Sequence, residues 1–178
     1  MVFQENLKRH ENMVFFQNFK RGNALIDSIL IVVVLFVLAI GALYGSIILD
    51  DIDTDIQADA DMSVEAKNIS GTLNTNYIPL MDNLFLLAFV LFSVFTVVSV
   101  FMLDSHPIFF IISVILLIAV LLVSMLLGNV FEDVMTDSSV TSYSNQFTYT
   151  SWIMDNIVMV VIGMAGMVLT ALYVKMRQ

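Results

Sequence analysis

The chain has 178 residues, of which 59% are hydrophobic and only 13% are charged. A soluble domain is about half apolar and about a quarter charged, so this composition does not fit one. Seven basic against sixteen acidic residues give a net charge of −9, which excludes a protein that binds nucleic acid through a basic surface. The absence of cysteine excludes disulfides, cysteine-ligated metals and a thiol nucleophile.

Residues 1–23 combine apolar and charged side chains at helical spacing. Phe3, Leu7, His10 and Val14 form one stripe, and charged residues occupy much of the remaining surface. This pattern predicts an amphipathic helix on the cytoplasmic membrane surface. A frayed tail and a docking segment for a partner protein are the alternatives. The basic residues near both termini that we expect to contact lipid headgroups are Lys8, Arg9, Lys20, Arg21, Lys175 and Arg177.

Four long apolar runs follow, and each approaches the roughly 20 residues that a helix needs to cross a bilayer. They predict spans at about 24–49, 83–103, 107–128 and 154–174. Four such runs in a chain of this length leave no polar surface to enclose them in a soluble core. We therefore expect an all-α integral membrane protein whose four transmembrane helices form two hairpins, with residues 24–178 as one membrane domain.

Charge is distributed unequally between the two sides of this topology. Six of the seven basic residues flank the termini, and an even number of spans places both termini on one side. The positive-inside rule assigns that side to the cytoplasm, where six bases and four acids give +2. The opposite side would hold polar loops at 50–82 and 132–153, which with their immediate flanks contain twelve acids and one base, a net −11.

The tripeptide Met-Asp-Asn occurs at the start of both the second and the fourth span. Asp and Asn accept hydrogen bonds from the free N–H groups at helix N-termini, and Asp also complements the positive end of the helix dipole. We therefore favour capping over an internal duplication as the reason for the repeat. The residues expected to cap these helices are Asp82, Asn83, Asp155 and Asn156.

Small residues form packing faces on two of the spans. Gly41 and Gly45 make a GxxxG motif in the first span, and Gly163 and Gly166 lie together in the fourth. Such faces let helix backbones approach closely in lipid. We expect the two faces to pair inside one chain, with association of two chains as the alternative.

Residues that could support chemistry are scarce. Asp51, Asp53 and Asp55 match the opening of a calcium-binding EF-hand loop, but Ile56 stands where that loop needs glycine. Asp27 is the one ionisable residue clearly inside an apolar run, which is too little for a proton path. The sequence contains no phosphate-binding loop, metal-binding pair or catalytic set. We therefore expect no enzymatic activity, no catalytic or metal-binding residues and no cofactor.

These features together favour a structural or scaffold protein of a larger membrane-embedded assembly. The expected partners are the lipid bilayer and other membrane proteins, with a homo-oligomer as a further option and no direct binding of nucleic acid. The alternative is a small oligomeric channel, a holin-like protein or a transporter subunit. A pore would then form only on oligomerisation, because one copy has no charged residues in the middle of its spans.

Two long spans are joined by the turn DSHPIFF at 104–110, and the second of them is followed by GNVFED at 128–133. Over this stretch, from Pro79 to Met135, the chain resembles small multi-span membrane proteins of membrane-containing, tailless icosahedral viruses and phages. The resemblance implies a non-enzymatic component of the internal virion membrane that contacts capsid or other membrane proteins. A subunit of a cellular membrane complex is the alternative that the sequence leaves open.

Overall fold

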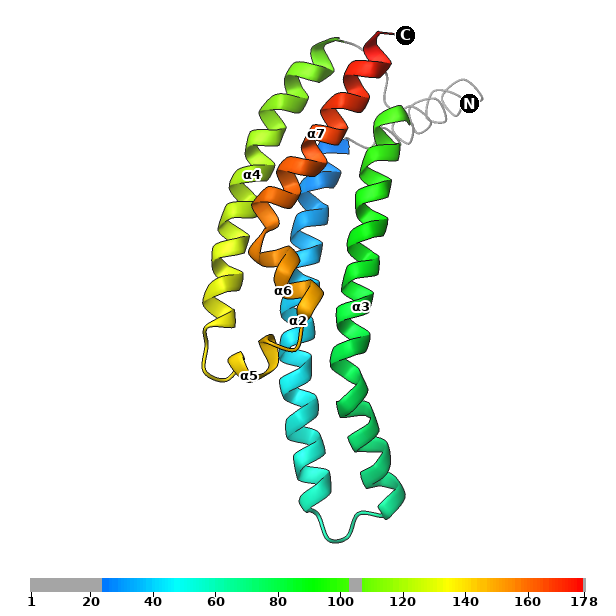
Figure 1. Cartoon of the computed structure of the whole chain (residues 1–178), viewed down its shortest axis with the longest axis vertical. Coiled ribbons are helices and arrows are strands. Elements are labelled where there is room, and N and C mark those ends of the chain that lie inside the picture. The colour runs from blue at the N-terminus through cyan, green and yellow to red at the C-terminus, as the bar shows by residue number, and fades with distance from the viewer. Residues whose placement is uncertain (1–23, 103–106, 178) are drawn as a thin grey trace, which may run out of the picture.

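The computed structural model describes residues 24–102 and 107–177, which contain helices and turns but no strand. The helices are α2 (Ala24–Ala58), α3 (Val64–Met102), α4 (Pro107–Met135), α5 (Thr141–Ser144), α6 (Thr148–Asp155) and α7 (Ile157–Met176). The four long helices form an elongated bundle, and α5 and α6 lie against its side (Figure 1). The predicted amphipathic helix at 1–23 lies outside the described residues.

Four helices are long and apolar enough to cross a membrane, which confirms the predicted all-α chain with four candidate spans. Many of their outward-facing side chains are apolar, and Leu30, Val37 and Leu122 are each more than half exposed. Such a surface is stable against lipid and not against water. The four segments are Ile29–Ala58, Val64–Ser99, Ile111–Met135 and Ile157–Lys175. The fold is that of an integral membrane protein.

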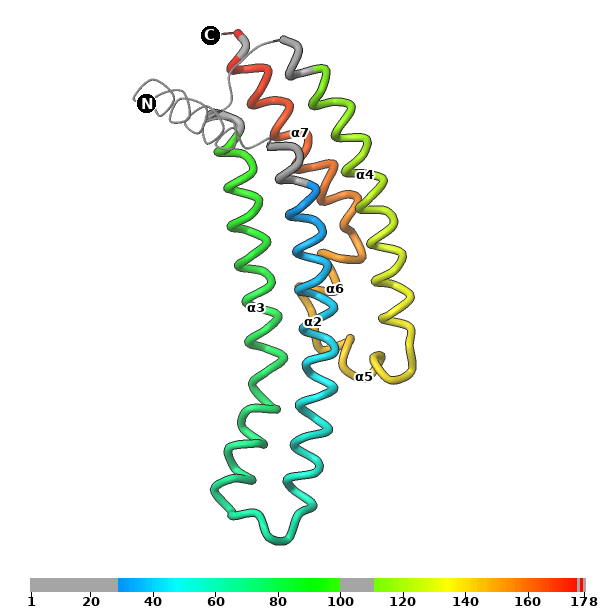
Figure 2. The backbone as a smooth tube through the Cα atoms, turned by 180° about the vertical axis from the view of Figure 1, so that it is seen from behind, coloured from blue at the N-terminus to red at the C-terminus, as the bar shows by residue number. Residues whose placement is uncertain are grey.

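The long helices form two antiparallel pairs, α2 with α3 and α4 with α7. The pairs meet where α2 packs on α4 and α3 packs on α7. Although α3 and α4 are consecutive in the chain, they occupy diagonal positions on opposite sides of α7 (Figures 1 and 2). Each long helix therefore has two neighbours, and one face of each helix is left to contact lipid or another protein.

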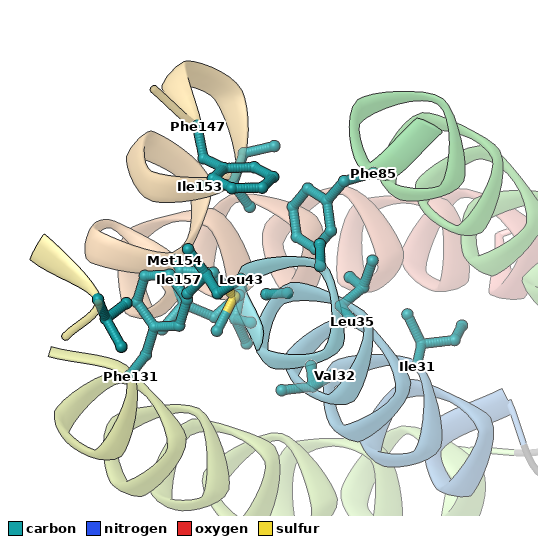
Figure 3. Packing of buried hydrophobic residues seen from close by; sticks show 14 of the residues in the cluster. Ile31, Val32, Leu35, Leu43, Phe85, Phe131, Phe147, Ile153, Met154 and Ile157 are labelled. Carbon is teal, nitrogen blue, oxygen red and sulfur yellow. The ribbon is translucent and has the colours of Figure 1, made fainter. Parts of the chain in front are cut away.

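The largest buried side chains lie where α6 enters the bundle. Phe147 and Met154 from the α6 region pack with Leu43 of α2, Phe85 of α3 and Phe131 of α4 (Figure 3). Four of these five side chains are at most 1% exposed, and Phe85 is 3% exposed. Through this cluster the short helix α6 packs against three of the four spans, namely α2, α3 and α4.

Residues 50–82, predicted as a polar loop, are mostly helical. α2 continues to Ala58 and α3 begins at Val64, so only residues 59–63 form the turn. The two helices contain 35 and 39 residues, which corresponds to about 52 Å and about 58 Å at about 1.5 Å per residue. A bilayer core is only about 30 Å thick. The two helices therefore extend past the rest of the bundle as a paired hairpin (Figure 2).

Residues 132–153, the second predicted loop, also contain helical structure. α4 continues to Met135, and the chain then folds back through α5 and α6 onto the sides of α2, α3 and α4. This second segment packs on its own bundle, because its apolar residues Val140, Phe147 and Ile153 are buried there.

Several hydroxyl groups inside the spans donate hydrogen bonds within their own helices. Ser93, Thr96 and Ser124 each donate a hydrogen bond to the carbonyl oxygen four residues earlier, at 2.7–2.8 Å. Within the described part of the chain, no buried side-chain nitrogen or oxygen lacks a partner. A membrane interior requires this, because it offers no water to hydrogen-bond with polar groups.

Candidate functional site

The polar residues of the described chain gather at one end of the bundle, which we call the hairpin end. It comprises the projecting hairpin (residues 50–82) together with α5 and α6. The opposite end, where α2 begins and α7 ends, is the terminal end (Figure 1). Two of the six predicted headgroup-binding residues are described there, Lys175 in the last turn of α7 and Arg177 at its C-cap.

Polar contacts join the two helices of the projecting hairpin. Asn74 Nδ2 donates a hydrogen bond to Asp50 Oδ1 at 2.9 Å. Nearer the turn, Gln57 Nε2 donates to the carbonyl oxygen of Lys67 and Lys67 Nζ donates to that of Gln57, both at 2.9 Å. Gln57 Nε2 also lies 3.1 Å from Asp53 Oδ1. These contacts fix the register of the two helices.

The turn between the two helices is closed by local hydrogen bonds. The Asp61 backbone N–H donates to Asp59 Oδ1 at 2.8 Å. Ser63 Oγ accepts a hydrogen bond from the Ala66 N–H at 3.2 Å, which caps the start of α3. The hairpin is thus ordered from its base to its tip.

The surface of the projecting hairpin carries an unbalanced negative charge. Its exposed acidic side chains are Asp51, Asp55, Asp59, Asp61 and Glu65. Asp51, Asp53 and Asp55, which match the opening of an EF-hand loop, lie along helix α2. The described residues contain no group of three or more His, Cys, Asp or Glu side chains able to hold a metal ion. The hairpin therefore presents an acidic surface, which attracts basic groups over a distance set by the ionic strength.

Helix α5 is attached to the base of the projecting hairpin by one short hydrogen bond. The Tyr143 hydroxyl donates to Asp50 Oδ2 at 2.5 Å. The hydrogen bond to this carboxylate stabilises the protonated phenol and raises the pKa of Tyr143 to about 12. Because Asp50 also accepts from Asn74, its carboxylate joins α2, α3 and α5.

Asp82, in α3, caps a different helix from the one predicted. The residue is 5% exposed, and its carboxylate accepts from the Tyr149 N–H at 3.0 Å, the Thr150 N–H at 2.7 Å and the Thr150 hydroxyl at 2.8 Å. The first N–H groups of a helix have no partner inside it. Phe147, at the N-cap position of α6, provides no side-chain cap, so Asp82 takes that role from across the bundle.

The other predicted caps do not cap the spans that follow them. Asn83 lies inside α3 and donates to the carbonyl oxygen of Pro79 at 2.7 Å. Asn156 occupies the N-cap position of α7 but makes no side-chain cap there. Its amide instead donates to the carbonyl oxygen of Trp152 at 2.9 Å, at the end of α6. Asp155 is the last residue of α6.

Asp155 lines a cleft of about 380 Å³ between α4 and the junction of α6 with α7. Asn129 and Glu132 of α4 line the same cleft. Partial burial, and then repulsion from Glu132, raise the pKa of Asp155 above its usual range. The cleft therefore holds a carboxyl group, Asp155, whose ionisation is disfavoured by its surroundings.

The four packing glycines have different surroundings. A Cβ atom added to Gly45 would overlap the ring of Tyr77, whose Cζ would lie 2.9 Å away. No described atom outside the local helix lies within 4 Å of a Cβ added to Gly41, Gly163 or Gly166. The expected pairing of the two small-residue faces within one chain is therefore absent from the described structure. Gly45 instead lets α3 approach α2.

The centre of the bundle holds a small apolar cavity of about 40 Å³ between α2, α3, α4 and α7. Thr96 is the one polar side chain among the described residues that line it, and its hydroxyl is bonded to the Phe92 carbonyl oxygen. A single copy thus has an apolar centre at this level.

The roles of Gln57 and Asn74, which join the two hairpin helices, and of Tyr143, which joins α5 to α2, were not predicted from the sequence. A signal was present, because Asp50, Asp53 and Gln57 follow each other at intervals of three and four residues, which places them on one helix face. The segment's polarity and acidity obscured that periodicity.

The fold and this polar end define the class of protein: a four-span helical membrane protein with a paired helical projection at one end. Comparison with protein-family models, with curated proteins and with solved structures finds no match.

Proposed function

We propose that this protein is a non-enzymatic scaffold of a larger membrane-embedded assembly. The four spans anchor it in the bilayer, and the projecting hairpin holds a binding surface away from the membrane. Other membrane proteins, or the capsid proteins of a lipid-containing virion, are the proposed partners.

The observation that carries the proposal is the way in which the projecting hairpin is built. Its helices are continuous with two spans, so their position is coupled to the membrane anchor. Contacts such as Asn74 with Asp50 and Gln57 with Lys67 hold the two helices together. A binding surface that is ordered before contact loses less conformational entropy when a partner binds.

The sidedness of the protein is part of the proposal. Lys175 and Arg177 lie at the terminal end, and the positive-inside rule places such residues in the cytoplasm. The acidic hairpin end then lies on the opposite side of the membrane. For a virion membrane, the resemblance over Pro79–Met135 supplies the argument, and a cellular complex would use the same surface.

The test is photo-crosslinking of the full chain in its native membrane. A crosslinking residue in place of Asp55, which is exposed on the hairpin, should yield discrete adducts with a partner protein. The matched control replaces Val37, 60% exposed near the middle of a span, and should label lipid.

Identifying the adduct distinguishes virion from cellular complex. Two results would contradict the scaffold: no protein adduct from Asp55 or other exposed hairpin positions, or selective ion flux through liposomes that contain only this chain. The second result would support the small-channel alternative.

A further inference from the structure

The outer face of α3 carries apolar side chains in the part of the helix that belongs to the projecting hairpin. Ile69 is 62% exposed, Leu73 59% and Leu80 54%. Counted from Asp82 at the base of the hairpin, Leu73 is nine residues away and Ile69 thirteen, which corresponds to about 13 Å and about 20 Å along the helix. A headgroup layer is only about 5–7 Å thick. With the membrane boundary at Asp82, a placement that rests on the proposed function, Leu73 and Ile69 face water in a single copy, unlike the side chains in the spans.

These residues belong to one seam with the spacing of a coiled coil. Intervals of three and four residues connect Ala66, Ile69, Leu73, Asn76 and Leu80, which we call the α3 seam. This alternation keeps one stripe of a helix turned toward a partner helix. The same intervals continue into the span through exposed residues, namely Asn83, Leu87, Val90 and Val94.

We propose that the α3 seam pairs with the α3 seam of a second copy of this chain, in parallel and in register. Two copies inserted in one membrane with the same topology present α3 in the same direction. A two-fold axis along the membrane normal then places each seam residue opposite its own counterpart, which is a closed, self-complementary interface. This inference goes beyond the scaffold function and holds in a virion or in a cellular membrane.

The distribution of charge supports a second copy as the partner. Residues 68–81 contain no charged side chain, although the helix beside them carries Asp50, Asp51, Asp53 and Asp55. A basic partner would bind to the acidic helix α2 and not to this uncharged face. Pairing through α3 leaves the two acidic helices on the outer sides of the dimer, where their mutual repulsion is smallest.

Asn76 gives the pairing its register. It is the one amide among the apolar residues of the α3 seam, and its side chain donates to the Thr72 carbonyl oxygen at 2.8 Å in one copy. A polar asparagine within an apolar seam is best accommodated opposite another asparagine, so it selects the in-register pair at some cost in stability.

The natural absence of cysteine allows a direct test by single-cysteine crosslinking. The full chain is reconstituted in bilayers with Ile69→Cys, Leu73→Cys or Thr75→Cys, and mild oxidant is added. The seam variants should form disulfide-linked dimers. Thr75→Cys, which is also exposed on the same helix but lies off the seam, should form no disulfide-linked dimer.

A second measurement keeps the test independent of disulfide geometry. Leu73→Lys should shift the mass of the particle in nanodiscs from dimer to monomer without loss of helical content, whereas Thr75→Lys should leave the dimer intact. Equal crosslinking at positions 73 and 75 would overturn the proposal. So would a monomeric mass for the unaltered chain, which would mean that a different protein covers the seam.

Discussion

Asp82 and Thr150 are 68 residues apart in the sequence, yet one carboxylate oxygen of Asp82 accepts both the backbone N–H and the hydroxyl of Thr150, at 2.7 Å and 2.8 Å. Thr150 is fully buried and Asp82 is nearly so. The pair fixes the start of α6 against α3, and α6 carries side chains that complete the core at the hairpin end. The position of one short helix therefore depends on a carboxylate from a distant part of the chain.

Replacing Asp82 should destabilise the protein, because its carboxylate caps α6 from a buried position. Asp82→Ala leaves the Tyr149 and Thr150 N–H groups without an acceptor, and we expect a loss of about 2–3 kcal/mol in the free energy of unfolding. Denaturation in detergent micelles measures the change. Asn83→Ala is the control, because Asn83 bonds only within its own helix among the contacts described. Equal effects of the two substitutions would contradict the capping role of Asp82.

Gly45 should be sensitive to a side chain and Gly41 should not. Gly45→Ala puts a methyl group against the ring of Tyr77, and overpacking of this kind costs about 1–3 kcal/mol. Gly41→Ala meets open space and should be neutral or slightly stabilising, because alanine favours a helix over glycine. Thermal unfolding of both variants tests this. Tyr77→Phe, which removes the hydroxyl nearest the new methyl group, should partly restore Gly45→Ala. Failure of that rescue would locate the strain elsewhere.

The sequence was sufficient to predict the four spans but not the outer helices. The length of an apolar run such as 107–128 predicts a transmembrane helix, because few structures other than a membrane span contain so many consecutive apolar residues. The segment 50–82 is helical for a different reason, namely polar contacts between α2 and α3, such as Asn74 with Asp50. Pairing between residues 24 positions apart cannot be inferred from local polarity, so the segment resembled a loop.

The capping roles show the same limit. Asp82 and Asn83 have a sequence typical of a helix start, and this predicted a cap for the span that follows them. The helix in fact begins at Val64, so Asp82 became available to cap α6. Local preference identified a capping residue, and the tertiary structure determined which helix it caps.

Tyr143 should titrate later than an ordinary tyrosine. Its pKa is raised to about 12 by the hydrogen bond to Asp50, so the bond contributes stability below the ordinary value of 10.0 and loses that contribution as pH rises from there to about 12. Ultraviolet titration should show one tyrosinate forming near the upper end of this range. Asp50→Asn should lower that pKa. An unchanged titration curve in Asp50→Asn would mean that the Tyr143–Asp50 contact is absent in the membrane-embedded protein.

Neutralising Asp155 should stabilise the protein at neutral pH. The raised pKa of Asp155, caused by burial and by Glu132, means that its charged form is less stable in the folded state than in the unfolded one. That penalty is fully present above the folded-state pKa and disappears as pH falls below the ordinary value of 3.8. Asp155→Asn should therefore unfold at a higher temperature than the unaltered chain at pH 7, with the difference vanishing in acid. A stability gain that persists unchanged in acid would rule out this electrostatic cause.

The central claim is that four spans anchor an ordered hairpin on the side of the membrane opposite to the termini. The most direct test labels single cysteines in sealed membrane vesicles of known orientation with a reagent that cannot cross the bilayer. Asp59→Cys at the hairpin turn should react only from one side, Arg177→Cys only from the other, and Leu122→Cys in a span from neither. Reaction of Asp59→Cys and Arg177→Cys from the same side, or protection of Asp59→Cys from both sides, would contradict the claim.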